Sequence, residues 1–202
     1  MSRDLFTRGV IQEETGETAR RSWNTSPFQE GFARSRFAMN VVLGLILVLA
    51  TIALMEFVAY ATHRWIMHGP GWFLHASHHR VRNGPFEAND LYAIFFAMPS
   101  ILLLLGGAQL GWGAWAVWMG AGIAAYGAIY FGFHDVIVHR RIGIRYVPRS
   151  RYMKRIVQAH RLHHAVESRL GAVSFGFLWA KPVESLKQEL AANGGVLRGP
   201  SS

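Results

Sequence analysis

Long apolar stretches alternate with shorter polar segments along most of this chain of 202 residues. Residues 37–61 form the first apolar stretch, and its only charged residue is Glu56. A helix of that length would be roughly 37 Å long, enough to cross a bilayer with some tilt. Residues 91–133 contain no charged residue, which leaves room for two more spans, over 91–105 and 114–133, joined by a turn among the glycines between them. The pattern predicts an all-α membrane bundle of three or four transmembrane helices.

The polar segments define the expected domain limits. Residues 1–36 mix six arginines with five acidic residues, and we expect a disordered N-terminal extension without a cleavable signal peptide. Residues 37–182 are expected to form one membrane-embedded domain, and residues 183–202 a C-terminal tail. The apolar stretch 170–180 is too short to span a bilayer, so we expect it to lie at the interface or to cover a site.

Composition supports a membrane protein, because hydrophobic residues make up 51% of the chain and charged residues only 16%. The chain has no cysteine, which excludes disulfides, thiolate metal sites and iron–sulfur clusters. The net charge of +9 favours an anionic lipid surface or an acidic partner. The basic and aromatic residues do not follow a pattern typical of nucleic-acid-binding modules.

All ten histidines fall into four short boxes. Boxes one and three have the spacing H-x4-H, and boxes two and four have the spacing H-x2-HH. In order, the boxes are His63 and His68; His75, His78 and His79; His134 and His139; and His160, His163 and His164. Histidine is the commonest side-chain metal ligand. Ten exceed the four to six ligands of one ion, so we predict two metal ions, with one or two histidines left to support the ligands.

The two spacings place their histidines differently around a helix. The three histidines of an H-x2-HH box share one helix face. The two of an H-x4-H box lie about 140° apart on an ideal α-helix and converge only if the helix ends or bulges at the second histidine. The Gly69-Pro70-Gly71 sequence after His68 supplies such an end, and residues 140–143 can do the same after His139.

The order of boxes and spans fixes the topology. Boxes one and two follow the first span, and boxes three and four follow the third, so all four emerge on the same side of the membrane. That side carries 15 of the lysines and arginines and the N-terminal side carries six. The positive-inside rule therefore places the boxes in the cytoplasm. Seven basic residues in 140–155 fit either this rule or a docking face for an acidic electron donor.

Acidic residues near the boxes are candidates for supporting roles. Glu56 shares a helix face with His63, so we expect it either to orient that ligand or to be hydrogen-bonded within the bundle. Glu87, Asp90 and Asp135 are candidates for orienting ligand histidines or delivering protons, and helix capping or loop hydrogen bonding explains them equally well. The glycines of the third span favour close helix packing over a slot for a lipid.

The boxes and the sequences around them resemble the non-haem di-iron membrane hydroxylases of the fatty-acid hydroxylase superfamily, and most closely the short bacterial β-carotene 3-hydroxylases. The resemblance covers roughly residues 40–182. Its most specific part is the sequence Phe-Glu-Ala-Asn-Asp-Leu-Tyr at residues 86–92. It also includes residues 63–69, 134–135, 155–165 and 173–177.

This resemblance implies two iron ions bound by the histidines, and hydroxylation of β-ionone rings at C3 with O2, which converts β-carotene to cryptoxanthin and then zeaxanthin. Two electrons are required, and a ferredoxin-like protein is the implied donor, since the chain has no convincing dinucleotide-binding fingerprint. The enzyme would lie in the inner membrane, with its metal site on the cytoplasmic side. A fatty-acid or sterol hydroxylase is the alternative. A histidine-rich metal transporter is less favoured because it would place ligands along the spans.

Overall fold

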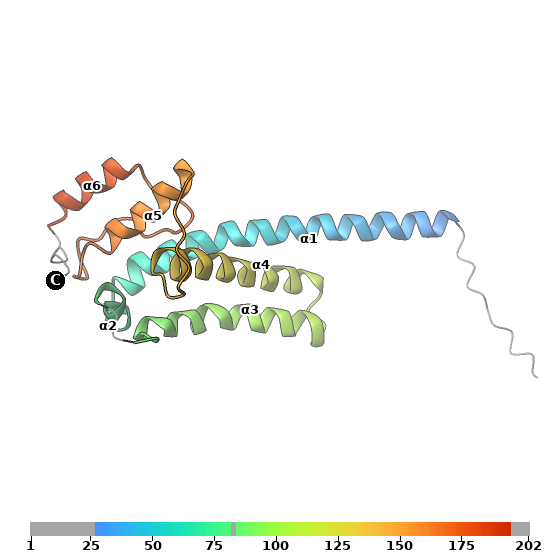
Figure 1. Cartoon of the computed structure of the whole chain (residues 1–202). Helices are drawn as coiled ribbons and strands as arrows, with labels where there is room; N and C mark the ends of the chain where they lie inside the picture. The colour runs from blue at the N-terminus through green and yellow to red at the C-terminus, as the bar shows by residue number, and fades with distance from the viewer. Residues whose placement is uncertain (1–26, 82–83, 195–202) are drawn as a thin grey trace, which may run out of the picture. The chain divides into compact units, whose positions relative to one another are not determined.

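The computed structural model describes residues 27–81 and 84–194, and it is helical with irregular connections over these ranges. Its elements, labelled as in Figure 1, are α1 (Pro27–Ala61), η1 (Thr62–Met67), α2 (Trp72–His75), η2 (Ala76–His79), η3 (Ala88–Asp90), α3 (Leu91–Gln109), α4 (Ala114–Tyr130), η4 (Phe131–Val138), α5 (Arg151–His163) and α6 (Val183–Ala192). The predicted all-α class is therefore confirmed.

Three helical segments are long and apolar enough to cross a membrane, namely Arg36–Met67, Ala88–Gln109 and Ala114–Val138. Most large apolar side chains of the first two segments are exposed, as expected for helices surrounded by lipid. In the third segment most are half-buried or buried, and the exposed ones are Trp115, Ile129 and Phe131. The first and third segments continue beyond the predicted spans and include the first histidine of boxes one and three. Residues 1–26 of the predicted extension lie outside the described residues. Residues 27–36 are helical, so α1 begins ten residues before the predicted span.

The connection between α3 and α4 lies at the predicted turn. Gly111 and Gly113 there adopt φ values of +71° and +96°, a left-handed conformation that glycine enters without steric cost. α4 then packs closely on both of its neighbours. At Gly120 it meets α3, where the Ser100 hydroxyl donates to the Gly120 carbonyl over 2.8 Å, and at Gly122 it meets Thr51 of α1. The packing interpretation of the small residues holds at these two glycines.

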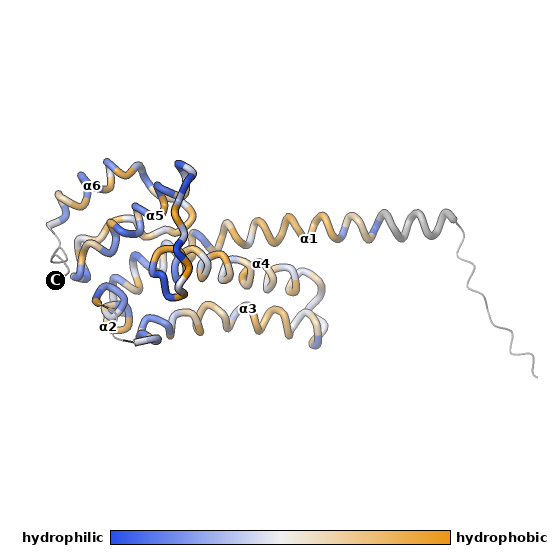
Figure 2. Tube along the Cα trace, in the orientation of Figure 1, coloured by the Kyte–Doolittle hydropathy of each residue, from blue (hydrophilic) through white to orange (hydrophobic). Residues whose placement is uncertain are grey.

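A polar cap lies at the box-bearing ends of the spans, and Figure 2 shows the change from mostly hydrophobic spans to this more hydrophilic region. It contains α2, η2, α5, α6 and the irregular stretch 164–182. The Ser150 hydroxyl caps α5 by accepting from the Met153 N–H over 3.1 Å. α6 occupies the first ten residues of the segment predicted as a tail, and its Leu186 is 1% exposed against the main core.

The contact at Gly122 gives a test of helix packing. A Cβ at Gly122 would lie 2.7 Å from the Thr51 Cβ, whereas one at Gly127, also on α4, would meet nothing within 4 Å. We expect Gly122→Ala to cost about 1–3 kcal/mol because α1 and α4 must move apart. Gly127→Ala should be neutral, or stabilising by up to about 1 kcal/mol. Thermal unfolding in detergent measures both, and equal melting temperatures for the two variants would contradict this packing.

Candidate metal centre

The fold brings the four histidine boxes together as two compact groups. Within each group the nitrogen atoms available for a metal lie within 4.8 Å of one another. Every histidine except the half-buried His139 is at most 9% exposed. Cluster one consists of His63, His68, His75, His79 and His163, and cluster two consists of His78, His134, His139, His160 and His164.

The two histidines of box one converge, and so do the two of box three, because the helix widens at each of these boxes. α1 passes into the π-helical turn η1, where the His68 N–H donates to the His63 carbonyl over 3.0 Å. The same i→i+5 bond recurs in η4, from the His139 N–H to the His134 carbonyl over 2.9 Å. A turn closed by this bond brings residue i+5 back above residue i. Each H-x4-H pair therefore faces a single cluster, which confirms the expectation that a bulge or helix end is required.

Boxes two and four behave differently, because each of them contributes to both clusters. In box two, His75 and His79 join cluster one and His78 joins cluster two. In box four, His163 joins cluster one, whereas His160 and His164 join cluster two. The spacing alone did not indicate this division. The histidines of box four lie at the C-terminal end of α5, whose last residue is His163. In box two, His75 ends α2 and the other two histidines lie in the 3-10 turn η2, so the single α-helix expected for this box does not form.

All five rings of cluster one are held by a hydrogen bond at Nδ1 to a neutral oxygen. The His75 Nδ1 donates to the side-chain oxygen of Asn89 over 2.6 Å. The other four donate to backbone carbonyls of the stretch 164–182, and the pairs are His63 with Phe175 (2.9 Å), His68 with Arg169 (2.9 Å), His79 with Val166 (2.6 Å) and His163 with Val173 (2.9 Å). A carbonyl oxygen only accepts, so each Nδ1 carries the proton and each Nε2 keeps a free lone pair.

These lone pairs point at one another. The Nε2 atoms of His63 and His75 are 3.1 Å apart, and those of His68 and His163 are 3.2 Å apart. Because the protons are on Nδ1, these contacts contain no hydrogen bond. Burial, followed by the nearby rings, lowers the pKa of His163 well below its usual value, so a second proton does not bridge them. The arrangement suits a cation, since an ion about 2.1 Å from two nitrogens at roughly a right angle holds them about 3.0 Å apart.

Cluster two has similar spacing but charged partners. The Nε2 atoms of His78 and His134 are 2.9 Å apart, and those of His160 and His164 are 3.0 Å apart. The His78 Nδ1 lies 2.9 Å from a carboxylate oxygen of Glu87. The His134 Nδ1 lies 3.5 Å from a carboxylate oxygen of Asp135. Burial lowers the pKa of His78 and His160 as well.

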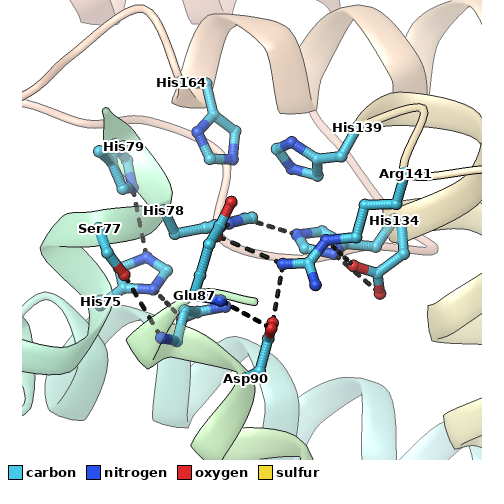
Figure 3. Close-up of polar contacts among 12 residues, drawn as sticks. His75, Ser77, His78, His79, Glu87, Asp90, His134, His139, Arg141 and His164 are labelled. Atoms are coloured by element: carbon cyan, nitrogen blue, oxygen red, sulfur yellow. Dashed lines mark hydrogen bonds and ion pairs between the residues drawn. The ribbon is translucent and has the colours of Figure 1, made fainter. Parts of the chain in front are cut away.

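Arg141 joins the three acidic residues that were singled out from the sequence. Its Nη2 lies 2.7 Å from Asp90 and 3.3 Å from Glu87, and its Nε lies 2.8 Å from Asp135. Figure 3 shows the guanidinium between Glu87 and Asp90, with His78 and His134 beside it. Asp90 also accepts from the Glu87 N–H over 2.9 Å in a capping box at η3. Glu87 and Asp135 thus lie against histidines, whereas Asp90 caps a turn and pairs with Arg141. Proton delivery by any of the three stays a prediction.

Glu56 has the second of its two expected roles. One carboxylate oxygen accepts from three consecutive N–H groups, at 2.8 Å from Phe177, 2.9 Å from Leu178 and 3.3 Å from Trp179. The other oxygen accepts from the Tyr126 hydroxyl over 2.8 Å. The Nδ1 of His63 is instead bonded to the Phe175 carbonyl. Glu56 therefore ties the irregular stretch 164–182 to α1 and α4. The interpretation that it orients His63 directly was wrong.

The apolar stretch 170–180 covers the site, as expected. The Phe177 ring stacks on His63 at a centroid separation of 5.6 Å, and the Phe175 ring lies 5.3 Å from His163. Arg141 and Asn89 were not predicted from the sequence as partners of the site. Asn89 lies within the most specific part of the family resemblance, which was the available signal for it. Arg141 was one of seven basic residues in its stretch, and nothing in the sequence separated it from the others.

A cavity of about 490 Å³ opens between α1, α3 and α4 and reaches both clusters. Its walls are mostly apolar and include Ala59, Phe96, Ala97, Ile123 and Gly127. His63 of cluster one and His134 of cluster two form part of its inner end, together with Asp90 and Asp135. An apolar molecule lying between the spans can therefore approach both clusters.

Comparison with known proteins gives consistent matches. The profile of the family described as "Fatty acid hydroxylase" matches residues 48–181. A protein named beta-carotene hydroxylase from Paracoccus sp. (strain PC1) is 50% identical over 154 residues, which cover 76% of this chain and 93% of the relative. Another of that name from Pantoea ananas is 48% identical over 155 residues, covering 76% and 87%. No solved structure matched the chain.

The two clusters predict two separable metal sites. Replacing His79 and His163 by alanine removes two nitrogens from cluster one, and replacing His160 and His164 removes two from cluster two. We expect each double variant to lose about one ion per chain and to retain the other. Elemental analysis of the purified protein measures this loss, with Gln158→Ala on the same helix as the control. Loss of both ions in both variants would show that the ligands form one inseparable site.

The position of Arg141 predicts that it supports cluster two alone. Arg141→Gln removes the cation that holds Glu87 and Asp135 against their histidines, and partners of this kind are worth about 10–100-fold in metal affinity. The adjacent, exposed Arg140 gives a matched control in Arg140→Gln. With a chelator present, we expect one of the two ions to leave about 10–100-fold faster from the Arg141 variant and at the unchanged rate from the control. Equal acceleration of both ions would contradict this role.

Proposed function

This chain belongs to the fatty acid hydroxylase family, and we propose that it is a membrane β-carotene hydroxylase, as its relatives are named. The observation that carries the proposal is the apolar cavity between the spans, which ends at one histidine from each metal cluster. A substrate dissolved in the bilayer can reach that cavity between α1, α3 and α4, whereas a water-soluble substrate would bind poorly in an apolar pocket.

We infer that all ten histidines hold two iron ions, five around each. When bound, the iron supplies the redox chemistry that activates O2 for attack on a C–H bond. The chain contributes fixed tautomers in cluster one, because an acceptor at each Nδ1 leaves each Nε2 free to bind metal. Phe175 and Phe177 pack against the histidine rings and exclude water from this side of the site.

The substrate we propose is the β-ionone ring of a carotenoid, hydroxylated at C3, so that β-carotene becomes cryptoxanthin and then zeaxanthin. In each turnover a C–H bond becomes C–OH and the second oxygen atom of O2 leaves as water. This balance requires two electrons and two protons. Asp90 and Asp135 border the cavity and lie beside cluster two, so they are the groups best placed to pass protons. The electrons come from a separate ferredoxin-like protein.

The excess of lysine and arginine on the box-bearing side supports a cytoplasmic location for the metal site, in the inner membrane. The first and third spans continue as helices into boxes one and three, and the ten histidines form two groups at the span ends. Such an arrangement is typical of a fixed catalytic centre. A transporter would instead require ligands spaced along a path through the spans. This arrangement favours the enzyme over the transporter.

The direct test is expression in cells that accumulate β-carotene, with the pigments separated by chromatography. We expect conversion to zeaxanthin, with cryptoxanthin as the intermediate, and loss of conversion when His78 or His163 is replaced by alanine. If β-carotene is unchanged while the protein is in the membrane and iron is supplied, the proposed substrate is wrong. Fatty acids and sterols would then be the next substrates to assay.

Blocking the cavity separates substrate binding from metal binding. Ala97 lines the cavity, and its neighbour Met98 is 51% exposed on the outer face of α3. We expect Ala97→Phe to lower conversion about tenfold or more, equivalent to ~1.4 kcal/mol, while the iron content stays the same. Met98→Phe should convert β-carotene at the wild-type rate. Full activity of Ala97→Phe would show that the ring binds elsewhere.

A further inference from the structure

α5 presents two opposite faces with different chemistry. His160, His163 and His164 lie on its inner face and belong to the two clusters. At 100° per residue, the opposite face carries Arg151, Lys154, Arg155 and Arg161, together with Gln158. The ligand face is buried, whereas Arg151, Lys154 and Arg161 are exposed and Arg155 is half-buried. We call these four cations the outer face of α5.

The charge of the outer face is not balanced nearby. Residues 136–166 contain no aspartate or glutamate. Within the described ranges, none of the four cations forms an ion pair, in contrast to Arg141, which pairs with three acids. The outer face also borders a groove of about 650 Å³ whose far wall includes Pro182 and Val183. An exposed, unbalanced basic surface beside a groove attracts an acidic partner.

The direction of the outer face favours a protein over a lipid surface as that partner. The ligand face of α5 looks toward clusters at the ends of the spans, and both clusters include histidines from η1 or η4, which continue α1 and α4. The opposite face therefore looks away from the bilayer. Figure 1 shows α5 at the box-bearing ends of α3 and α4, in the polar cap.

We propose that the outer face of α5 is the docking surface for an acidic protein that carries a one-electron redox centre. The proposal rests on the hydroxylase function, which consumes two electrons per turnover and therefore requires two single-electron transfers from such a donor, each oxidising one reduced donor molecule. A donor seated there is separated from three ligand histidines by the width of one helix, about 10 Å. No other described helix joins an exposed basic surface to ligands of both clusters.

The test uses the iron-loaded full chain in nanodiscs of zwitterionic lipid, with a reduced acidic [2Fe–2S] ferredoxin as the probe. The charge-reversal variant is Arg151→Glu/Lys154→Glu/Arg161→Glu. The control, Lys181→Glu/Lys187→Glu, reverses two exposed lysines on and beside α6. We expect the KM for ferredoxin to rise about tenfold or more in the triple variant and to change little in the control. The iron content and the turnover with dithionite should match the wild type in both.

Two further measurements make the outcome decisive. An unchanged KM for ferredoxin in the triple variant overturns the proposal, and a simultaneous loss of binding to anionic vesicles would assign the outer face to lipid instead. If the wild type does not hydroxylate β-carotene even with dithionite, the proposed function fails. Binding of ferredoxin to the nanodiscs, measured directly, then still tests the docking surface, and equal binding by wild type and triple variant overturns it.

Discussion

The structure depends on imidazole nitrogens that face one another without a proton between them. In cluster one every Nδ1 donates to an oxygen, so every Nε2 is an unprotonated acceptor, and neighbouring Nε2 atoms lie 3.1–3.2 Å apart. Such contacts are repulsive in the absence of a cation. Burial also lowers the pKa of His75 to about 3, so added protons do not relieve the repulsion near neutral pH. Metal binding and the folding of the cap are therefore coupled.

The irregular stretch 164–182 transmits this requirement to the rest of the bundle. It supplies four of the five acceptors of cluster one through backbone carbonyls, which no sequence motif encodes directly. Glu56 in turn accepts hydrogen bonds from three N–H groups of this stretch and from the Tyr126 hydroxyl. A carboxylate near the end of a span therefore fixes the distance between the stretch and the clusters. The same stretch holds the His63 ring through the Phe175 carbonyl, so the position of His63 is linked to the distance between α1 and α4.

Much of this arrangement could be predicted from the sequence, and the remainder has physical reasons. Apolar length and the absence of charge defined the spans, and the number of histidines indicated two metal ions. The H-x4-H spacing indicated a bulge or helix end at the second histidine of boxes one and three. The assignment of His78 and His79 to different clusters could not be predicted, because the two are adjacent in one box and only their long-range partners show which cluster each joins. The role of Glu56 was equally undetermined, since its partners lie 70 and more than 120 residues away in the chain.

The two clusters have the same number of histidines and different electrostatic surroundings. The described acceptors of cluster one are four carbonyls and an amide, all neutral, whereas His78 and His134 of cluster two lie against carboxylates. A carboxylate partner raises the basicity of its histidine more than a carbonyl does. Arg141 moderates this difference by pairing with both carboxylates, and it holds them in place. The same pair of sequence boxes occurs twice, yet the histidines of the two clusters differ in basicity as metal ligands. This difference comes from residues outside the boxes.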